Sequence, residues 1–288
     1  MKSVKRVCVV MGDDRPILLG DAARASYPSL AYEINRRFCE RNGWDFRYEH
    51  YQLRSRPWGK LSAYSTAARQ HRAASWVKLL AILRALELGH EIVIWIDSDC
   101  IFYCDDADWS DFLGLFGRGD LHLAAWVDRP YSEDQLCAGF FAVRNDAPVR
   151  DMLRLLWERP SPTSFRHAYE QVEFQRFLRS QPPSWHHLMH EPMFALEDPK
   201  QRLLHLATDS RHLRLPIFLR WFEDRRIPPH PQHTERHVHV DLDIGLADER
   251  LSGRRPGLLE SAEREAWPVF QQALGLARRV RSRIFPHR

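Results

Sequence analysis

Two carboxylates follow directly on an apolar segment near the middle of the chain. The segment Ile92–Ile96 reads Ile-Val-Ile-Trp-Ile, and Asp97, Ser98 and Asp99 come straight after it. A short apolar run of this kind is typical of a central strand in an α/β sheet, and such sheets bind their ligands beyond the carboxyl ends of the strands. Two acids separated by one residue at that position suit a hard divalent cation, Mn²⁺ or Mg²⁺. Such an ion would bridge the phosphates of a nucleotide ligand.

Strands and helices alternate around this segment. Short apolar runs predict further strands at residues 7–11, 44–51, 121–127 and 139–143. Helical spacing of apolar residues predicts helices at residues 29–42, 75–89, 147–159 and 169–179. Residues 54–72 are polar and without periodicity, which predicts a loop, whereas residues 237–240 predict a last strand and residues 258–284 a last helix. The alternation indicates an α/β fold with helices on both faces of a sheet.

The composition sets further limits on the class of protein. The chain has 288 residues, of which 44% are hydrophobic and 28% charged, and this excludes disordered and low-complexity classes. The five cysteines lack the spacing of a zinc site and are interpreted as reduced thiols. A net charge of +4 does not by itself indicate nucleic acid. We find neither a membrane-spanning run nor a signal peptide, and we therefore expect a cytoplasmic protein.

Several blocks of sequence, in this order, resemble the galactosyl/mannosyl/xylosyl transferase family, which includes fungal α-galactosyltransferases and plant xyloglucan xylosyltransferases. The first blocks are residues 41–45 (Arg-Asn-Gly-Trp-Asp), then Trp76-Val-Lys78, a helix, and the strand that ends in Asp-Ser-Asp. The last are residues 138–145 (Ala-Gly-Phe-Phe-Ala-Val-Arg-Asn) and the pair Glu170-Gln171. The blocks are scattered over residues 4–245.

The resemblance implies a fold and an activity. It implies a single GT-A-like mixed sheet of Rossmann type, flanked by helices, in residues 1–250, with a helical basic extension in residues 251–288. The implied reaction moves a hexose or pentose from a nucleoside diphosphate sugar, a UDP-sugar, to a hydroxyl acceptor such as a carbohydrate. The anomeric configuration would be retained, and the partners would be donor and acceptor rather than nucleic acid.

The resemblance also assigns roles to individual residues. Asp97 and Asp99 would hold the metal ion with a histidine, for which His239 fits best and His237 second. Gln171 would contact the sugar near its reacting carbon, and Glu170 would act beside it as an acid or hydroxyl acceptor. Contacts to the donor would come from a further set of residues, namely Lys78, Asp13, Asp14, Ser98 and Gly139.

The sequence departs from the family at some positions, and several of its features have alternative interpretations. Cys137 stands where the family has asparagine, and Glu170 stands for its aspartate. Lys78 is equally well interpreted as a solvated helix lysine, and Asp13-Asp14 as a plain turn. The acids of residues 105–108 would suit a metal-dependent phosphohydrolase, and the ten tryptophans would suit a non-catalytic carbohydrate-binding protein.

The end of the chain is basic and amphipathic. Four arginines, at positions 278, 279, 281 and 283, stand there among the apolar residues Val280, Ile284 and Phe285. Two interpretations stay open: weak peripheral contact with an anionic membrane face, and a solvated helix end favoured by the helix dipole.

Overall fold

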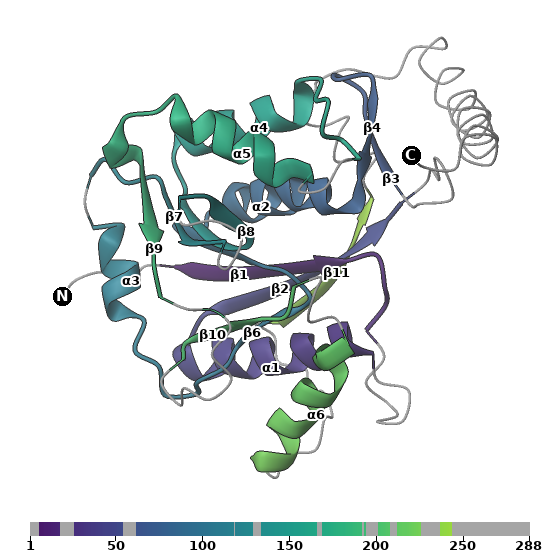
Figure 1. Ribbon diagram of the computed structural model, residues 1–288, viewed down its shortest axis with the longest axis vertical. Coiled ribbons are helices and arrows are strands. Elements are labelled where there is room, and N and C mark those ends of the chain that lie inside the picture. Colours follow the sequence, from purple (N-terminus) through teal and green to yellow (C-terminus); the bar gives the residue numbers. More distant parts are fainter. Residues whose placement is uncertain are drawn as a thin grey trace, which may run out of the picture.

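A seven-stranded mixed sheet forms the centre of the molecule (Figure 1). The computed structural model describes residues 6–17, 26–53, 62–117, 119–128, 134–165, 169–191, 193, 201–207, 212–225 and 237–243. The strand order is β11-β2-β1-β5-β8-β7-β9. Neighbouring strands are parallel except at β8, which runs antiparallel to both β5 and β7. The sheet strands are β1 (Val7–Asp13), β2 (Asp45–Gln52), β5 (Ile92–Ile96), β7 (Leu123–Val127), β8 (Leu136–Arg144), β9 (His186–Met189) and β11 (His237–Asp243).

Helices cover both faces of the sheet, which confirms the predicted α/β class. Figure 1 shows α2 (Lys78–Glu87), α4 (Ala147–Glu158) and α5 (Tyr169–Arg179) on one face. The opposite face carries α1 (Tyr27–Asn42), against which α6 (Arg214–Asp224) packs. The short helix α3 (Ser110–Leu115) lies near the β9 end of the sheet.

Strand β5 shows why its sequence is apolar throughout. Ile92, Ile94 and Ile96 point into the core on the α1 side, whereas Val93 and Trp95 point into the core on the α2 side. Because successive side chains of a strand face opposite sides, a strand covered on both faces needs an unbroken apolar run. The polar residues that follow it therefore mark the edge of the sheet.

The helix ends follow the expected signals. Gly43 follows α1 in the left-handed region with φ 67°, and its N–H bonds back to the last turn of the helix. Glycine adopts this conformation without the steric penalty of a Cβ atom. Asp146 caps α4 by accepting a hydrogen bond from the backbone N–H of Val149 at 3.1 Å.

Two pairs of short strands lie outside the central sheet. Residues 62–73 do not form the predicted loop; they form an antiparallel hairpin of β3 (Ser62–Ser65) and β4 (Gln70–Ala73). An apolar pattern could not predict this hairpin, because its residues are mostly polar. Some of them are nevertheless buried: Arg72 stacks on Trp76 and donates to the carbonyl oxygen of Trp157. The second pair joins β6 (Cys100–Phe102) to β10 (Leu203–His205), also antiparallel.

Other differences concern the ends of predicted elements. The helix predicted from residue 75 begins at Lys78, after a 3₁₀ turn at Ala74–Val77. The last predicted strand is present as β11 at the outer edge of the sheet. The predicted helix at 258–284, the extension at 251–288 and its basic arginines lie outside the described residues. Among the described helices, none combines the length and apolar character needed to cross a bilayer.

Candidate functional site

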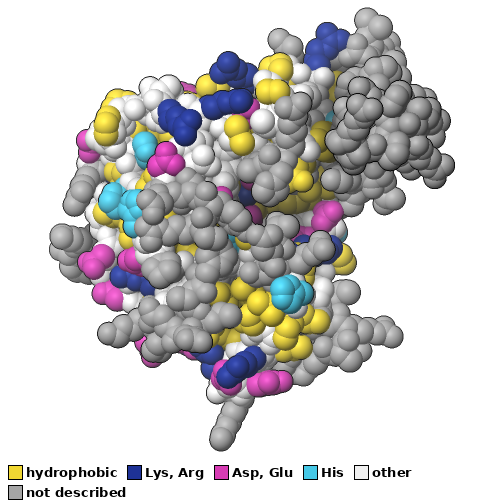
Figure 2. Space-filling view, in the orientation of Figure 1, with side chains coloured by type: hydrophobic (Ala, Val, Ile, Leu, Met, Phe, Trp, Pro, Cys, Tyr) yellow, Lys and Arg dark blue, Asp and Glu magenta, His cyan; other side chains and the backbone are white. Residues whose placement is uncertain are grey.

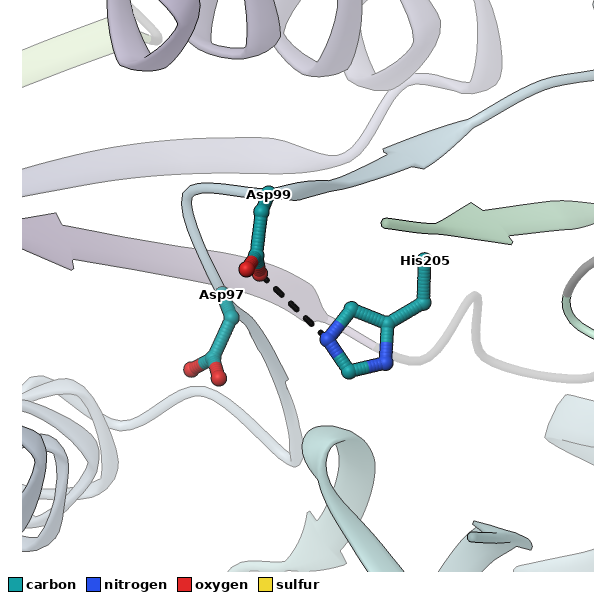
Figure 3. A group of neighbouring side chains, drawn as sticks. All are labelled: Asp97, Asp99 and His205. Atoms are coloured by element: carbon teal, nitrogen blue, oxygen red, sulfur yellow. Dashed lines mark ion pairs between the residues drawn. The ribbon is translucent and has the colours of Figure 1, made fainter. Parts of the chain in front are cut away.

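Two aspartates and a histidine meet at the carboxyl end of β5 (Figure 3). One ligand atom from each of Asp97, Asp99 and His205 lies within 4.8 Å of the others. Asp97 directly follows β5, Asp99 directly precedes β6, and His205 is the last residue of β10. We call these three residues the carboxylate–histidine cluster.

Strand pairing brings the histidine to the aspartates. In the β6–β10 ladder His205 lies opposite Cys100, the residue after Asp99. The backbone N–H of Leu206 also donates to the carbonyl oxygen of Asp99 at 2.9 Å. Leu203 and Leu204 are buried in the core on the α1 side, so hydrophobic packing holds β10 in this register.

The two carboxylates have different electrostatic surroundings. Burial alone would raise the pKa of Asp99, but His205 at 3.3 Å and Arg214 at 2.5 Å outweigh it and lower that pKa. Burial dominates at Asp97 and raises its pKa, although Lys78 at 3.1 Å opposes the shift. Asp99 is therefore held as an anion.

His205 is the positively charged partner of Asp99. Burial alone would lower the pKa of its imidazole, but Cys137 and Asp99 outweigh that effect and hold it well above its usual value. Nε2 of the ring faces Asp99, and Nδ1 faces the thiol of Cys137. A cation bound to Nε2 would replace the proton there.

Lys78 lies behind the cluster rather than in solvent. Its side chain is 2% exposed, and its ammonium group donates to Asp97, to Glu170 and to the carbonyl oxygen of Ala138. Burial would lower its pKa, but the two carboxylates outweigh burial and raise it. In this structure all three N–H groups of Lys78 are used by the protein, and Lys78 orients Asp97 and Glu170; its contact with a diphosphate stays a prediction.

Glu170 and Gln171 open α5 as predicted, but both are tied into the fold. Glu170 is buried, with 4% of its surface exposed; its Oε1 binds Lys78, while its buried Oε2 has no hydrogen-bond partner among the residues that the structure describes. Gln171 accepts from the backbone N–H of Ala138 at 3.0 Å and donates to Asp128 at 2.7 Å. The unpartnered Oε2 marks a place where a hydroxyl group could donate.

Asp13 and Asp14 follow β1 at the same edge of the sheet. Arg15 binds both carboxylate oxygens of Asp13 at 2.6 Å and reaches Ser98 at 3.4 Å. Burial would raise the pKa of Asp13, but these arginine contacts lower it. Asp14 has a raised pKa, because it is partly buried and lies beside Asp13. Arg15 thus links Asp13 to Ser98 in the Asp97–Asp99 turn.

The third member of the cluster is His205, whereas the sequence predicted His239 or His237; a metal-binding role for those two histidines stays a prediction. Both of the predicted histidines belong to β11, which is separated from β5 by β2 and β1. At about 4.8 Å between neighbouring strands, the backbone of β11 lies roughly 14 Å from that of β5. The strand itself was predicted, but its position in the sheet cannot be read from its sequence. His205 was not singled out from the sequence; the only local signal for it would have been the short apolar run around this histidine, residues 203–206.

Arg214 is a further site residue that the sequence did not reveal. It begins α6, binds Asp99, and donates to the carbonyl oxygen of Leu206 at 2.6 Å and to the hydroxyl of Tyr27 at 3.0 Å. Arg15 and Arg214 both stack on the ring of Tyr27, at 4.6 and 4.9 Å from its centroid. Two guanidinium groups therefore stand at the rim of the cluster.

Hydrophobic side chains border the site on the side of α6. Figure 2 shows them gathered over α1 and α6, and the neighbours of Arg214 in sequence, Leu213 and Leu215, are both exposed. Because Arg214 itself reaches Asp99, this apolar surface adjoins the carboxylate–histidine cluster.

The two alternative interpretations, a phosphohydrolase and a carbohydrate-binding protein, rest on acids and tryptophans that make structural contacts. Asp105 binds Arg41 and Arg225, and Asp108 caps the turn at Ser110. Among the described residues, the only metal-competent group found is the carboxylate–histidine cluster, which leaves out Asp105, Asp106 and Asp108. Four large tryptophans, namely Trp76, Trp95, Trp126 and Trp157, are fully buried in the core rather than displayed for carbohydrate.

The fold is similar to that of a known glycosyltransferase. The chain overlays a glycosyltransferase involved in the glycosylation of the major capsid of PBCV-1 with a TM-score of 0.56, at 16% identity, over 75% of this chain and 99% of that one. The chain has a GT-A-like fold. Protein A197 of STIV aligns with a TM-score of 0.36, at 11% identity, over 70% of this chain and 95% of that one. No protein-family model matches the sequence, and no curated protein matches it.

Gly139 offers a test of the geometry around His205. A Cβ atom added to Gly139 would lie 2.6 Å from Cε1 of His205 and 2.8 Å from Nε2, which is too close for either group to stay in place. We expect Gly139→Ala to displace the imidazole and to weaken Mn²⁺ binding at least about tenfold, as loss of ligand orientation does. Titration calorimetry with MnCl₂ measures this effect.

The control for this variant is Gly114→Ala in α3. A Cβ atom at Gly114 meets no other atom within 4 Å, and alanine is the better helix former. Equal Mn²⁺ affinity in both variants and the wild type would show that the ring of His205 is not part of the metal site.

Proposed function

We propose that the chain is a metal-dependent glycosyltransferase that moves a hexose or pentose from a UDP-sugar to a hydroxyl acceptor with retention of configuration. The observation that carries the proposal is the carboxylate–histidine cluster at the carboxyl end of β5 in a GT-A-like sheet. The similarity to the glycosyltransferase of PBCV-1 supports it at the level of the fold. Retention rests on the sequence resemblance to the galactosyl/mannosyl/xylosyl transferase family.

The donor atoms of the cluster fit Mn²⁺ or Mg²⁺. Carboxylate oxygens suit both ions, and an imidazole nitrogen favours the transition metal, so Mn²⁺ is the better match. Asp97, Asp99 and His205 would hold the ion, which when bound would neutralise the charge that develops on the departing diphosphate. Asp99 would be the stronger ligand, because its lowered pKa keeps it anionic.

Arg214 and Arg15 supply fixed positive charge for the diphosphate. Arg214 contacts Asp99, and Arg15 contacts Ser98, so both guanidinium groups adjoin the turn that carries the two aspartates. A guanidinium group presents several N–H donors in one plane, which matches the oxygens of a phosphate. We assign to Arg214 the contact with the phosphate that leaves with the nucleoside.

Glu170 and Gln171 position the sugar and the acceptor. Lys78 holds one carboxylate oxygen of Glu170, which leaves the buried Oε2 to accept a hydrogen bond from a hydroxyl group. Gln171 is fixed by Ala138 and Asp128 beside it. In the proposed step the bond from the anomeric carbon to the diphosphate breaks while the acceptor oxygen bonds to the same face, and the acceptor proton passes to the departing phosphate.

A panel of nucleotide sugars tests the proposal. The protein is incubated with each sugar and Mn²⁺, and released nucleoside diphosphate is measured with and without a carbohydrate acceptor. We expect release from a UDP-sugar that is abolished by EDTA and restored by Mn²⁺. Cleavage of a simple phosphoester without release of nucleoside diphosphate would instead support a phosphohydrolase, and no turnover of any sugar would remove the catalytic claim.

A further inference from the structure

Cys137 contacts His205 at the ring nitrogen that does not face Asp99. Its sulfur lies 3.4 Å from Nδ1 of His205, and the residue is 1% exposed. The other ring nitrogen, Nε2, faces Asp99 at 3.3 Å, as the dashed line in Figure 3 shows. One imidazole therefore has a thiol at one nitrogen and the carboxylate at the other.

We propose that Cys137 is a positioning residue that sets the tautomer and the orientation of His205 for metal binding. The inference rests on the proposed function, in which Nε2 of His205 is a metal ligand. Cys137 would touch neither the metal nor the substrate.

The hydrogen-bond capacity of the two groups explains the role. A neutral imidazole carries its proton on one nitrogen only, and the nitrogen that binds a metal must offer its lone pair. Metal-binding histidines usually donate the other N–H to a nearby acceptor, which fixes the tautomer. The sulfur of Cys137 can accept a hydrogen bond from Nδ1–H, and that leaves the lone pair of His205 on Nε2.

Strand β8 also supports the ring of His205 and the segment that carries Asp97. Residues 137 and 139 lie two apart and therefore face the same side of the strand. Cys137 meets Nδ1, and the bare backbone of Gly139 lies against Cε1, so consecutive atoms of the ring are supported by one strand. The residue between them, Ala138, receives Lys78 at its carbonyl oxygen, and Gly139 receives the backbone N–H of Asp97 at 2.8 Å. The same strand thus holds both metal-binding segments.

Two substitutions separate a hydrogen bond from simple packing. Cys137→Ala removes the acceptor, whereas Cys137→Ser keeps a group that can donate and accept at the same place. We expect Mn²⁺ to bind the alanine variant about 10- to 100-fold more weakly than the wild type, and the serine variant within about threefold of it. Calorimetric titration of the full chain with MnCl₂ alone measures both. Cys104→Ala, which removes a partly exposed thiol elsewhere, is the control and should leave Mn²⁺ affinity unchanged.

Nitrogen NMR of ¹⁵N-histidine-labelled protein reports the tautomer directly. The signals of His205 are assigned by their loss in His205→Ala, and spectra are recorded with Mg²⁺, which is diamagnetic. At a Mg²⁺ concentration that just saturates the wild type, we expect a protonated Nδ1 and an unprotonated Nε2 in the wild type and in Cys137→Ser. In Cys137→Ala, which should bind the ion more weakly, we expect most rings to keep the proton on Nε2. An unprotonated Nε2 in Cys137→Ala under the same conditions would contradict the positioning role.

These experiments distinguish failure of the positioning role of Cys137 from failure of the proposed metal site. Wild-type Mn²⁺ affinity in Cys137→Ala would overturn the positioning role while the metal site stands. Equal losses in the alanine and serine variants would overturn it as well, because volume rather than hydrogen bonding would then matter. Absence of Mn²⁺ binding by the wild type would overturn the proposed metal site, and this inference with it.

Discussion

Replacing Asp99 with asparagine is expected to slow sugar transfer about 1000-fold or more, which corresponds to about 4 kcal/mol of transition-state stabilisation. Asp99 is the carboxylate whose pKa is lowered, and it lies between His205 and Arg214. The amide keeps the shape of the side chain but loses the charge that holds the cation. Turnover of a UDP-sugar at saturating Mn²⁺ measures the loss, and Asp97→Asn should behave in the same way.

The matched control is Asp151→Asn on α4. Asp151 is an exposed aspartate whose ion pair with Arg154 spans 3.6 Å, so its removal should change neither turnover nor stability by more than a surface substitution does. Urea unfolding shows whether each variant is folded. A folded Asp99→Asn protein with wild-type turnover would contradict the assignment of the metal site.

Replacing Lys78 with methionine is expected to lower the free energy of unfolding by about 3–5 kcal/mol. The methionine matches the length of the stem but leaves the buried Glu170 and the partly exposed Asp97 without their cation. An unpaired buried charge costs far more than an exposed one. The midpoint of urea unfolding at neutral pH measures the effect, and Arg220→Met, which removes a 78% exposed cation on α6, is the control.

A second variant shows whether the loss comes from the unpaired charge. Combining Lys78→Met with Glu170→Gln removes one of the two orphaned carboxylates, and we expect the double variant to be more stable than Lys78→Met alone. A loss of less than about 1 kcal/mol for Lys78→Met, the size of a surface change, would mean that Lys78 does not hold the carboxylates in solution.

The strand and acids that define the site could be predicted because their signals are local. A strand covered on both faces reads as an unbroken apolar run, and Asp97 and Asp99 stand where β5 ends. The glycine after α1 and the cap of α4 are equally local, since each concerns one helix end. These features need no knowledge of how distant segments pair.

The remaining features of the site depend on long-range pairing. His205 lies 106 positions after Asp99 on a strand of three residues, and only the register with β6 brings them together. The segment around His239 had the stronger strand pattern, but β11 lies at an edge of the sheet and is separated from β5 by β2 and β1. Lys78 and Glu170 lie in the first turns of helices, where charged residues are usually solvated. Their burial results from the packing of α2 on β1 and β5 and of α5 on β8. Periodicity carries no information about that packing.

Binding of UDP with and without Mn²⁺ tests the central claim most directly. Calorimetric titration of UDP into the wild-type protein should show affinity at least about tenfold higher, or 1.4 kcal/mol, with Mn²⁺ than with EDTA. In Asp99→Asn that difference should disappear while the protein remains folded. Equal UDP affinity with Mn²⁺ and with EDTA in the wild type would contradict a cation held by Asp97, Asp99 and His205 for a nucleoside diphosphate.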